Sequence, residues 1–110
     1  MSPFFKKNKF YAKRSKCNLG HSHPSILEGQ YCNQLQMLVK AKEIQGFEYA
    51  KKYELRVNGN PICNHFPDFT VTGKNGVVSV HETKGMESDL WRIKRKLFES
   101  LYNIEYIVIK

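Results

Sequence analysis

The sequence predicts a mixed α/β fold in the order helix, three strands, helix, strand. Two segments have the apolar spacing of amphipathic helices, and the runs between and after them are rich in β-branched residues and bounded by turn residues. The chain has 110 residues, of which 41% are hydrophobic. A chain of this size can bury one modest core, so we expect a single α/β sandwich with a mixed sheet.

The first helix is predicted to begin at Ser25, because Ser25 and Glu28 form the Ser-x-x-Glu pattern of a capping box. It extends for about 17 residues and ends before Gly46. The second helix is predicted over residues 87–103. One charged side chain falls within the apolar stripe of each helix, Glu28 in the first and Lys94 in the second. The apolar residues of the two stripes are Leu27, Tyr31, Leu35, Leu38 and Val39, and then Leu90, Trp91, Leu97, Phe98 and Leu101.

Three strands are predicted between the helices, over residues 47–57, 61–71 and 76–84. The turn Asn58-Gly59-Asn60-Pro61 joins the first two, and Asn75-Gly76 leads into the third. The last strand, residues 104–110, is very apolar, which is typical of the centre of a sheet or of a covered strand.

Charged side chains replace valines at one end of the third strand. Alternation places Glu82 and Lys84 on the same face as Val78 and Val80. Hairpin pairing could bring Asp68 opposite Glu82, at about 5 Å between Cβ atoms. Two carboxylates this close repel each other unless a cation or a proton joins them. Mg²⁺, which prefers oxygen ligands, is the simplest resolution.

These residues resemble the motif of the PD-(D/E)XK nuclease superfamily, and most closely that of small phage-encoded nucleases and Holliday-junction resolvases. The match lies in Pro67-Asp68 and Glu82-Thr83-Lys84, with Glu28 on the preceding helix. It covers residues 25–110, which we expect to form the nuclease domain. The resemblance implies a restriction-endonuclease-like αβββαβ core with a central mixed sheet flanked by helices.

The resemblance also implies a metal site. Asp68 and Glu82 would bind Mg²⁺, or Mn²⁺ in its place, together with the carbonyl of Thr83. Glu28 would bind the metal directly or through water. From the residues alone, Glu28 could instead serve only as the capping-box acid.

Two lysines complete the implied site. Lys84 would orient the attacking water or help to deprotonate it, and Lys94 would contact a phosphate. The implied activity is that of a metal-dependent endonuclease, a hydrolase of phosphodiester bonds in branched DNA. Paired cuts in a four-way junction need two sites in fixed relation, so we expect a homodimer. A nuclease that nicks or end-cuts ordinary duplex DNA, or a catalytically silent nucleic-acid-binding module, remains an alternative.

The formal net charge of +8 is concentrated in residues 1–24, a basic N-terminal arm. This arm has six basic residues and no acid, so we expect it to bind the DNA backbone. A solvated tail is the alternative reading. The six basic residues are Lys6, Lys7, Lys9, Lys13, Arg14 and Lys16.

The three cysteines form no CxxC pair, which disfavours disulfides and favours a reducing, cytoplasmic setting. No apolar run is long enough to span a bilayer, so no membrane partner is expected. A structural zinc site is the less favoured reading of the cysteines and histidines, because their spacings differ from the usual C-x2-4-C and H-x3-5-H patterns. The residues concerned are Cys17, His21, His23, Cys32, Cys63 and His65.

Overall fold

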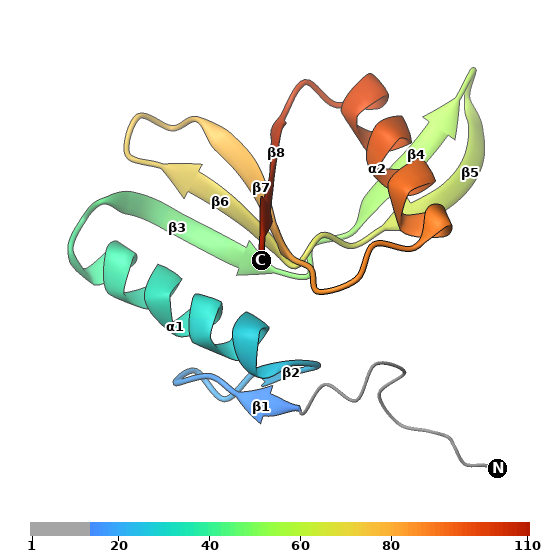
Figure 1. Ribbon diagram of the computed structural model, residues 1–110. Helices are drawn as coiled ribbons and strands as arrows, with labels where there is room; N and C mark the ends of the chain where they lie inside the picture. The colour runs from blue at the N-terminus through green and yellow to red at the C-terminus, as the bar shows by residue number, and fades with distance from the viewer. Residues whose placement is uncertain (1–13) are drawn as a thin grey trace, which may run out of the picture. The chain divides into compact units, whose positions relative to one another are not determined.

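The structure is a computed structural model that describes residues 14–110. These residues form a mixed α/β fold with two α-helices, and they divide into two compact units, residues 14–41 and 42–110 (Figure 1). Four of the predicted DNA-binding residues lie outside the described residues, namely Lys6, Lys7, Lys9 and Lys13. No helix within residues 14–110 is long and apolar enough to cross a membrane.

The first unit contains a small hairpin and one helix. Strands β1 (Ser15–Lys16) and β2 (Ser22–His23) pair antiparallel, and helix α1 (Ile26–Lys40) follows. Ser25 is the N-cap of α1, and its Oγ accepts a hydrogen bond from the backbone N of Glu28 at 3.1 Å. The predicted start of the helix is therefore confirmed.

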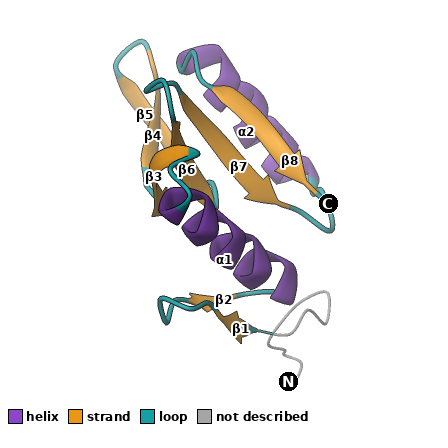
Figure 2. Ribbon diagram, turned by 90° about the vertical axis from the view of Figure 1, so that its left-hand side faces the viewer, coloured by secondary structure: helices purple, strands orange, loops and turns teal. Residues whose placement is uncertain are grey.

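The second unit is built on a mixed four-stranded sheet in the order β3-β6-β7-β8. The first three strands pair antiparallel, and β8 lies parallel to β7. Helix α2 (Asp89–Leu101) connects these two parallel strands, as Figure 2 shows, because a parallel pair needs a long crossover. The strands are β3 (Ile44–Tyr49), β6 (Phe69–Gly73), β7 (Val78–Thr83) and β8 (Glu105–Ile109).

Strand β8 is the last strand of this sheet, so of the two predicted alternatives the central position is wrong and the covered strand is confirmed. Its apolar character comes from cover on one face. Tyr106 belongs to the buried core, and Val108 packs against that core.

The predicted strands 47–57 and 61–71 are each divided in two. Strands β4 (Tyr53–Val57) and β5 (Asn60–His65) form a separate antiparallel pair beyond β3 and β6. Their predicted turn is confirmed, with positive φ at Asn58 (52°) and Gly59 (81°). The two continuous strands of the prediction are therefore wrong, although the turn between them is right.

The break lies where Ala50 faces the segment around Pro67. Ala50 has a φ of 56°, which ends a regular strand, and Pro67 has no N–H to donate to a ladder. The pairs Tyr49–Phe69 and Tyr53–His65 keep one register across the break. The four strands are thus one long hairpin, bent at a point that carries Asp68.

The core of the second unit lies between α2, the β4–β5 pair and the sheet. Trp91 and Phe98 supply the buried side chains of α2. Leu90 and Leu101, which the apolar stripe placed inward, are 63% and 42% exposed, because the two large aromatic residues set which face of α2 is buried. The buried cluster is Tyr53, Leu55, Val80, Trp91, Phe98 and Tyr106.

Candidate functional site

The β6–β7 hairpin brings Asp68 to the end of β7. Phe69 pairs with His81, so Asp68 comes next to the level of Glu82. The Oδ2 atom of Asp68 accepts two hydrogen bonds, both at 2.8 Å, from the backbone N and the Oγ1 of Thr83. The carboxylate of Asp68 is therefore fixed beside the residue that follows Glu82.

Glu82 is a buried carboxylate, 6% exposed, on the core face of β7. Its Oε1 accepts a hydrogen bond from the hydroxyl of Tyr106 at 2.6 Å, and the hydroxyl oxygen lies 2.8 Å from Nε2 of His65. A phenol has one hydrogen, which Tyr106 gives to Glu82, so Nε2 of His65 must donate to Tyr106. A chain of hydrogen bonds from β5 through β8 thus orients the Glu82 carboxylate.

Two lysines influence this chain of hydrogen bonds. Burial, together with the positive charges of Lys94 and Lys84, lowers the pKa of His65 to about 4, so His65 is neutral at pH 7. The Nζ of Lys84 lies 5.2 Å from the ring centroid of Trp91. Burial, followed by the charge of Glu82, raises the pKa of Tyr106, which therefore keeps its proton. The charges of Lys84 and Lys94 therefore act on His65, which belongs to the same chain of hydrogen bonds as the Glu82 carboxylate.

Sequence reasoning named Glu82 as a site residue but missed the two residues that orient it, His65 and Tyr106. His65 and Tyr106 are 41 positions apart, and only the fold brings them together. The one available signal was the hydroxyl group of Tyr106, in a last strand that is otherwise mostly aliphatic.

Glu28 lies in the first unit, and its carboxylate contacts a histidine. Its Oε2 is 2.5 Å from Nδ1 of His23, and both side chains are almost fully buried. The Ser25 cap uses the backbone N of Glu28 and leaves the carboxylate to His23. A role for Glu28 beside Asp68 and Glu82 stays a prediction.

The described part of the predicted arm, residues 14–24, is folded rather than extended. Arg14 and Lys16 are exposed, and the guanidinium of Arg14 donates to Oγ of Ser22 at 3.0 Å across the β1–β2 hairpin. Their contact with DNA stays a prediction.

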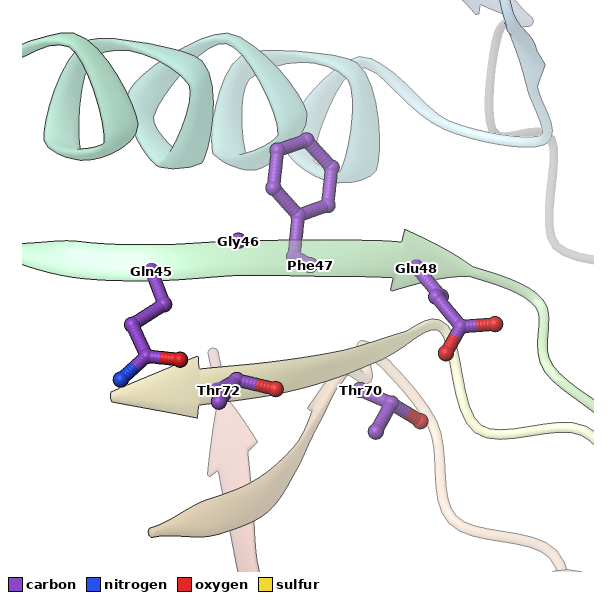
Figure 3. A pocket seen from close by; sticks show the side chains of 6 residues that line it. All are labelled: Gln45, Gly46, Phe47, Glu48, Thr70 and Thr72. Carbon is purple, nitrogen blue, oxygen red and sulfur yellow. The ribbon is translucent and has the colours of Figure 1, made fainter. Parts of the chain in front are cut away.

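A shallow pocket lies over β3 and β6 and is separate from Asp68 and Glu82. Phe47 points to the other side of β3 from the neighbouring polar side chains (Figure 3). Neither Asp68 nor Glu82 borders the pocket, and it contains no amine. Its lining residues are Gln45, Gly46, Phe47, Glu48, Thr70 and Thr72.

The structure also brings together four residues that sequence spacing had disfavoured as a zinc site. One ligand atom from each of Cys17, His21, His23 and Cys32 lies within 4.8 Å of all the others. Burial raises the pKa of the Cys17 thiol, but hydrogen bonds with His23, Cys32 and backbone groups outweigh burial and lower it to about 6. We call these four residues the Cys/His cluster.

The structure thus describes a small mixed α/β protein in which Asp68, at the bend of a long hairpin, is hydrogen-bonded to Thr83, the neighbour of the buried Glu82. Residues 7–109 match the model of the family described as "Protein of unknown function (DUF1064)", and the chain belongs to this family. No curated protein and no solved structure gives a significant match.

Proposed function

We propose that the protein is a metal-dependent endodeoxyribonuclease with a PD-(D/E)XK active site and a restriction-endonuclease-like core. The observation that carries the proposal is the placement of Asp68 beside Thr83, the neighbour of the buried and oriented Glu82. A buried carboxylate is costly unless hydrogen bonds or a cation compensate it. In the sequence, Pro67-Asp68 and Glu82-Thr83-Lys84 resemble the PD-(D/E)XK motif.

The donors at this site suit a hard cation. The carboxylates of Asp68 and Glu82 and the carbonyl of Thr83 are oxygen ligands, which Mg²⁺ and Mn²⁺ prefer. A carboxylate has about four lone-pair positions, so the hydrogen bonds from Thr83 and Tyr106 are compatible with a metal ligand role. When bound, Mg²⁺ would activate water and offset the charge of the phosphate.

The chain's own residues would position the reaction. Thr83 holds the Asp68 carboxylate, and Tyr106, supported by neutral His65, holds that of Glu82. Lys84 would orient the attacking water and offset charge on the phosphoryl oxygens, and Lys94 would bind a phosphate. The basic arm would add contacts to the DNA backbone that do not depend on sequence.

The proposal is tested by incubating the full chain with supercoiled plasmid, a labelled four-way junction and a linear duplex of the same sequence. We expect cutting with Mg²⁺ or Mn²⁺, no cutting with EDTA, and a preference for the junction. Equal cutting of the linear duplex would favour the nicking or end-cutting alternative. Binding of DNA without metal-dependent cutting would favour the silent binding module.

We also propose that the chain acts as a homodimer, since paired cuts in a junction require two sites. An apolar stripe on the solvent side of α2 supports this, because one helix packed on its own copy about a two-fold axis is self-complementary. Leu90 and Ile93 are each 63% exposed and Leu101 is 42% exposed, with half-buried Leu97 between them.

Ile93→Glu should therefore convert a dimer into a monomer, because the charge would be buried against its own copy. Light scattering at tens of micromolar measures the mass. Arg92→Glu is the matched control and should stay dimeric, because Arg92 is exposed and lies about 100° or more around α2 from every residue of the stripe. A wild-type chain that is monomeric at this concentration contradicts the proposal.

A further inference from the structure

The Cys/His cluster lies in the first unit, and none of its four residues is part of the proposed nuclease site. Cys17 and His21 lie at the two ends of the loop between β1 and β2, His23 ends β2, and Cys32 lies in the second turn of α1. We propose that Cys17, His21, His23 and Cys32 bind one structural Zn²⁺ ion. This inference does not depend on the proposed nuclease activity.

The distances suit a tetrahedral site. With Zn–S near 2.3 Å and Zn–N near 2.0–2.1 Å, ligand atoms of a tetrahedral Zn²⁺ lie roughly 3.3–3.8 Å apart. Nδ1 of His21 is 3.7 Å from Sγ of Cys32, which is within this range. All four ligand atoms lie within 4.8 Å of one another, so small side-chain rotations would close the site. Two thiols and two imidazoles form a donor set that is common in structural zinc sites.

The backbone holds the loop of the cluster independently of any ion. Within the loop, the backbone N of Cys17 donates to the carbonyl of His21 at 3.1 Å. The backbone N of Asn18 donates to Oδ1 of Asn33 at 2.6 Å, which joins the loop to α1 near Cys32. Gly29 lets α1 approach β1, because a Cβ at this position would collide with the side chain of Ser15. The ligands are therefore brought together by the fold.

Glu28 supplies the support that zinc-bound histidines usually have. A ligating imidazole commonly donates its second ring N–H to a carboxylate, which fixes the ring and raises its basicity. Nδ1 of His23 is 2.5 Å from Oε2 of Glu28, so Nε2 would be the ring atom of His23 that binds the metal. This arrangement also accounts for a carboxylate that is only 3% exposed in the first unit.

The first unit has few buried apolar side chains among its described residues. The buried hydrophobic residues among its described residues are Cys17, Cys32 and Leu35. Strands of two residues cannot form a stable hairpin by themselves, and small units of this kind commonly rely on a metal or a disulfide. Both cysteines are free thiols, so they can serve as zinc ligands. A metal would link the hairpin to α1.

The test begins with the wild-type full chain, reduced and freed of metal, titrated with Co²⁺ and then with Zn²⁺. We expect one equivalent of Co²⁺ to give the visible bands of a tetrahedral site and a near-ultraviolet band from thiolate ligands. Zn²⁺ should then displace Co²⁺ with the same stoichiometry. This readout needs no variant, so it does not depend on how substitutions affect folding. Absence of the thiolate band, or a stoichiometry far below one, would overturn the proposal.

Variants assign the ligands. Cys32→Ser leaves one of the two thiolate ligands, so it should lose roughly half or more of the thiolate-to-cobalt band, whereas Cys63→Ser, in the second unit, should keep the full band. Glu28→Gln should weaken Zn²⁺ binding by about 10–100-fold without removing a ligand. Glu82→Gln should bind Zn²⁺ as the wild type does, which separates this site from the nuclease proposal. Equal loss in the Cys32 and Cys63 variants would contradict the assignment.

Thiol modification of the native protein gives an independent readout. In the Zn²⁺-loaded chain a thiol reagent should modify Cys63 alone, and a chelator should make Cys17 and Cys32 reactive. Because Cys17 and Cys32 are also buried, the comparison is made in enough urea to unfold the metal-free chain. The same extent of modification with and without the chelator there would show that no metal protects these thiols and would overturn the proposal.

Discussion

Glu82→Gln should reduce the rate of DNA cleavage by about 10²–10³-fold, the loss typical when one group of a preorganised site is removed. The substitution keeps the shape of the side chain, and the amide oxygen can still accept the hydrogen bond of Tyr106. What it removes is the negative charge that a divalent cation requires. DNA affinity should be equal or slightly higher, because an acid near the phosphates is gone. Plasmid cleavage in Mg²⁺ and fluorescence anisotropy with labelled DNA measure the two quantities.

Asp68→Asn should behave in the same way, because Thr83 can still donate to the amide oxygen. Glu105→Gln is the matched control, since Glu105 is an exposed acid on the adjacent strand β8. It should cleave at the wild-type rate. Cleavage by Glu82→Gln or Asp68→Asn within a few-fold of wild type would remove these residues from the catalytic site.

Phe98→Ala should lower the free energy of unfolding by about 3–5 kcal/mol, a large part of the stability of a small domain. The side chain is fully buried, and its ring centroid lies 5.0 Å from those of Tyr53 and Tyr102 and 5.5 Å from that of Tyr106. Its removal would leave a cavity where α2 meets the β4–β5 pair. Urea unfolding followed by far-ultraviolet circular dichroism measures the change.

Phe66→Ala makes the same chemical change at a site that is 53% exposed, and it should alter the free energy of unfolding by no more than about 0.5 kcal/mol. If the two variants were equally stable, α2 would not depend on Phe98 for its attachment.

The local features of the fold were predictable because they depend on near neighbours. The Ser25 cap, the Asn58-Gly59 turn and the extents of β7 and α2 follow from residue preferences and periodicity. The bend was not predictable in the same way. Alanine has no preference for positive φ, so Ala50 carries no signal, and the alternating pattern continues through it. Pro67 was the one residue that indicated a break.

In the candidate site, too, the residues set by local patterns were predictable and those set by tertiary packing were not. Strand alternation identified Glu82 and Lys84, and the hairpin predicted that Asp68 would lie near them. His65 and Tyr106 meet through tertiary packing, which no local pattern encodes. The Cys/His cluster was named from the sequence but disfavoured, because spacing rules assume familiar loop lengths, whereas here β1 and β2 form an unusually short hairpin.

The bend in the hairpin separates a part of the chain that can vary in length from a part that cannot. Beyond Leu55 and Cys63, strands β4 and β5 pair only with each other and end at the turn formed by Asn58 and Gly59. Residues added or removed in facing pairs at this tip would keep the alternation of both strands and leave the backbone contact between Ala50 and Asp68 in place. The tip is therefore where this chain can change in length, and where a peptide tag can be inserted, without a shift in the register that places Asp68 beside Thr83.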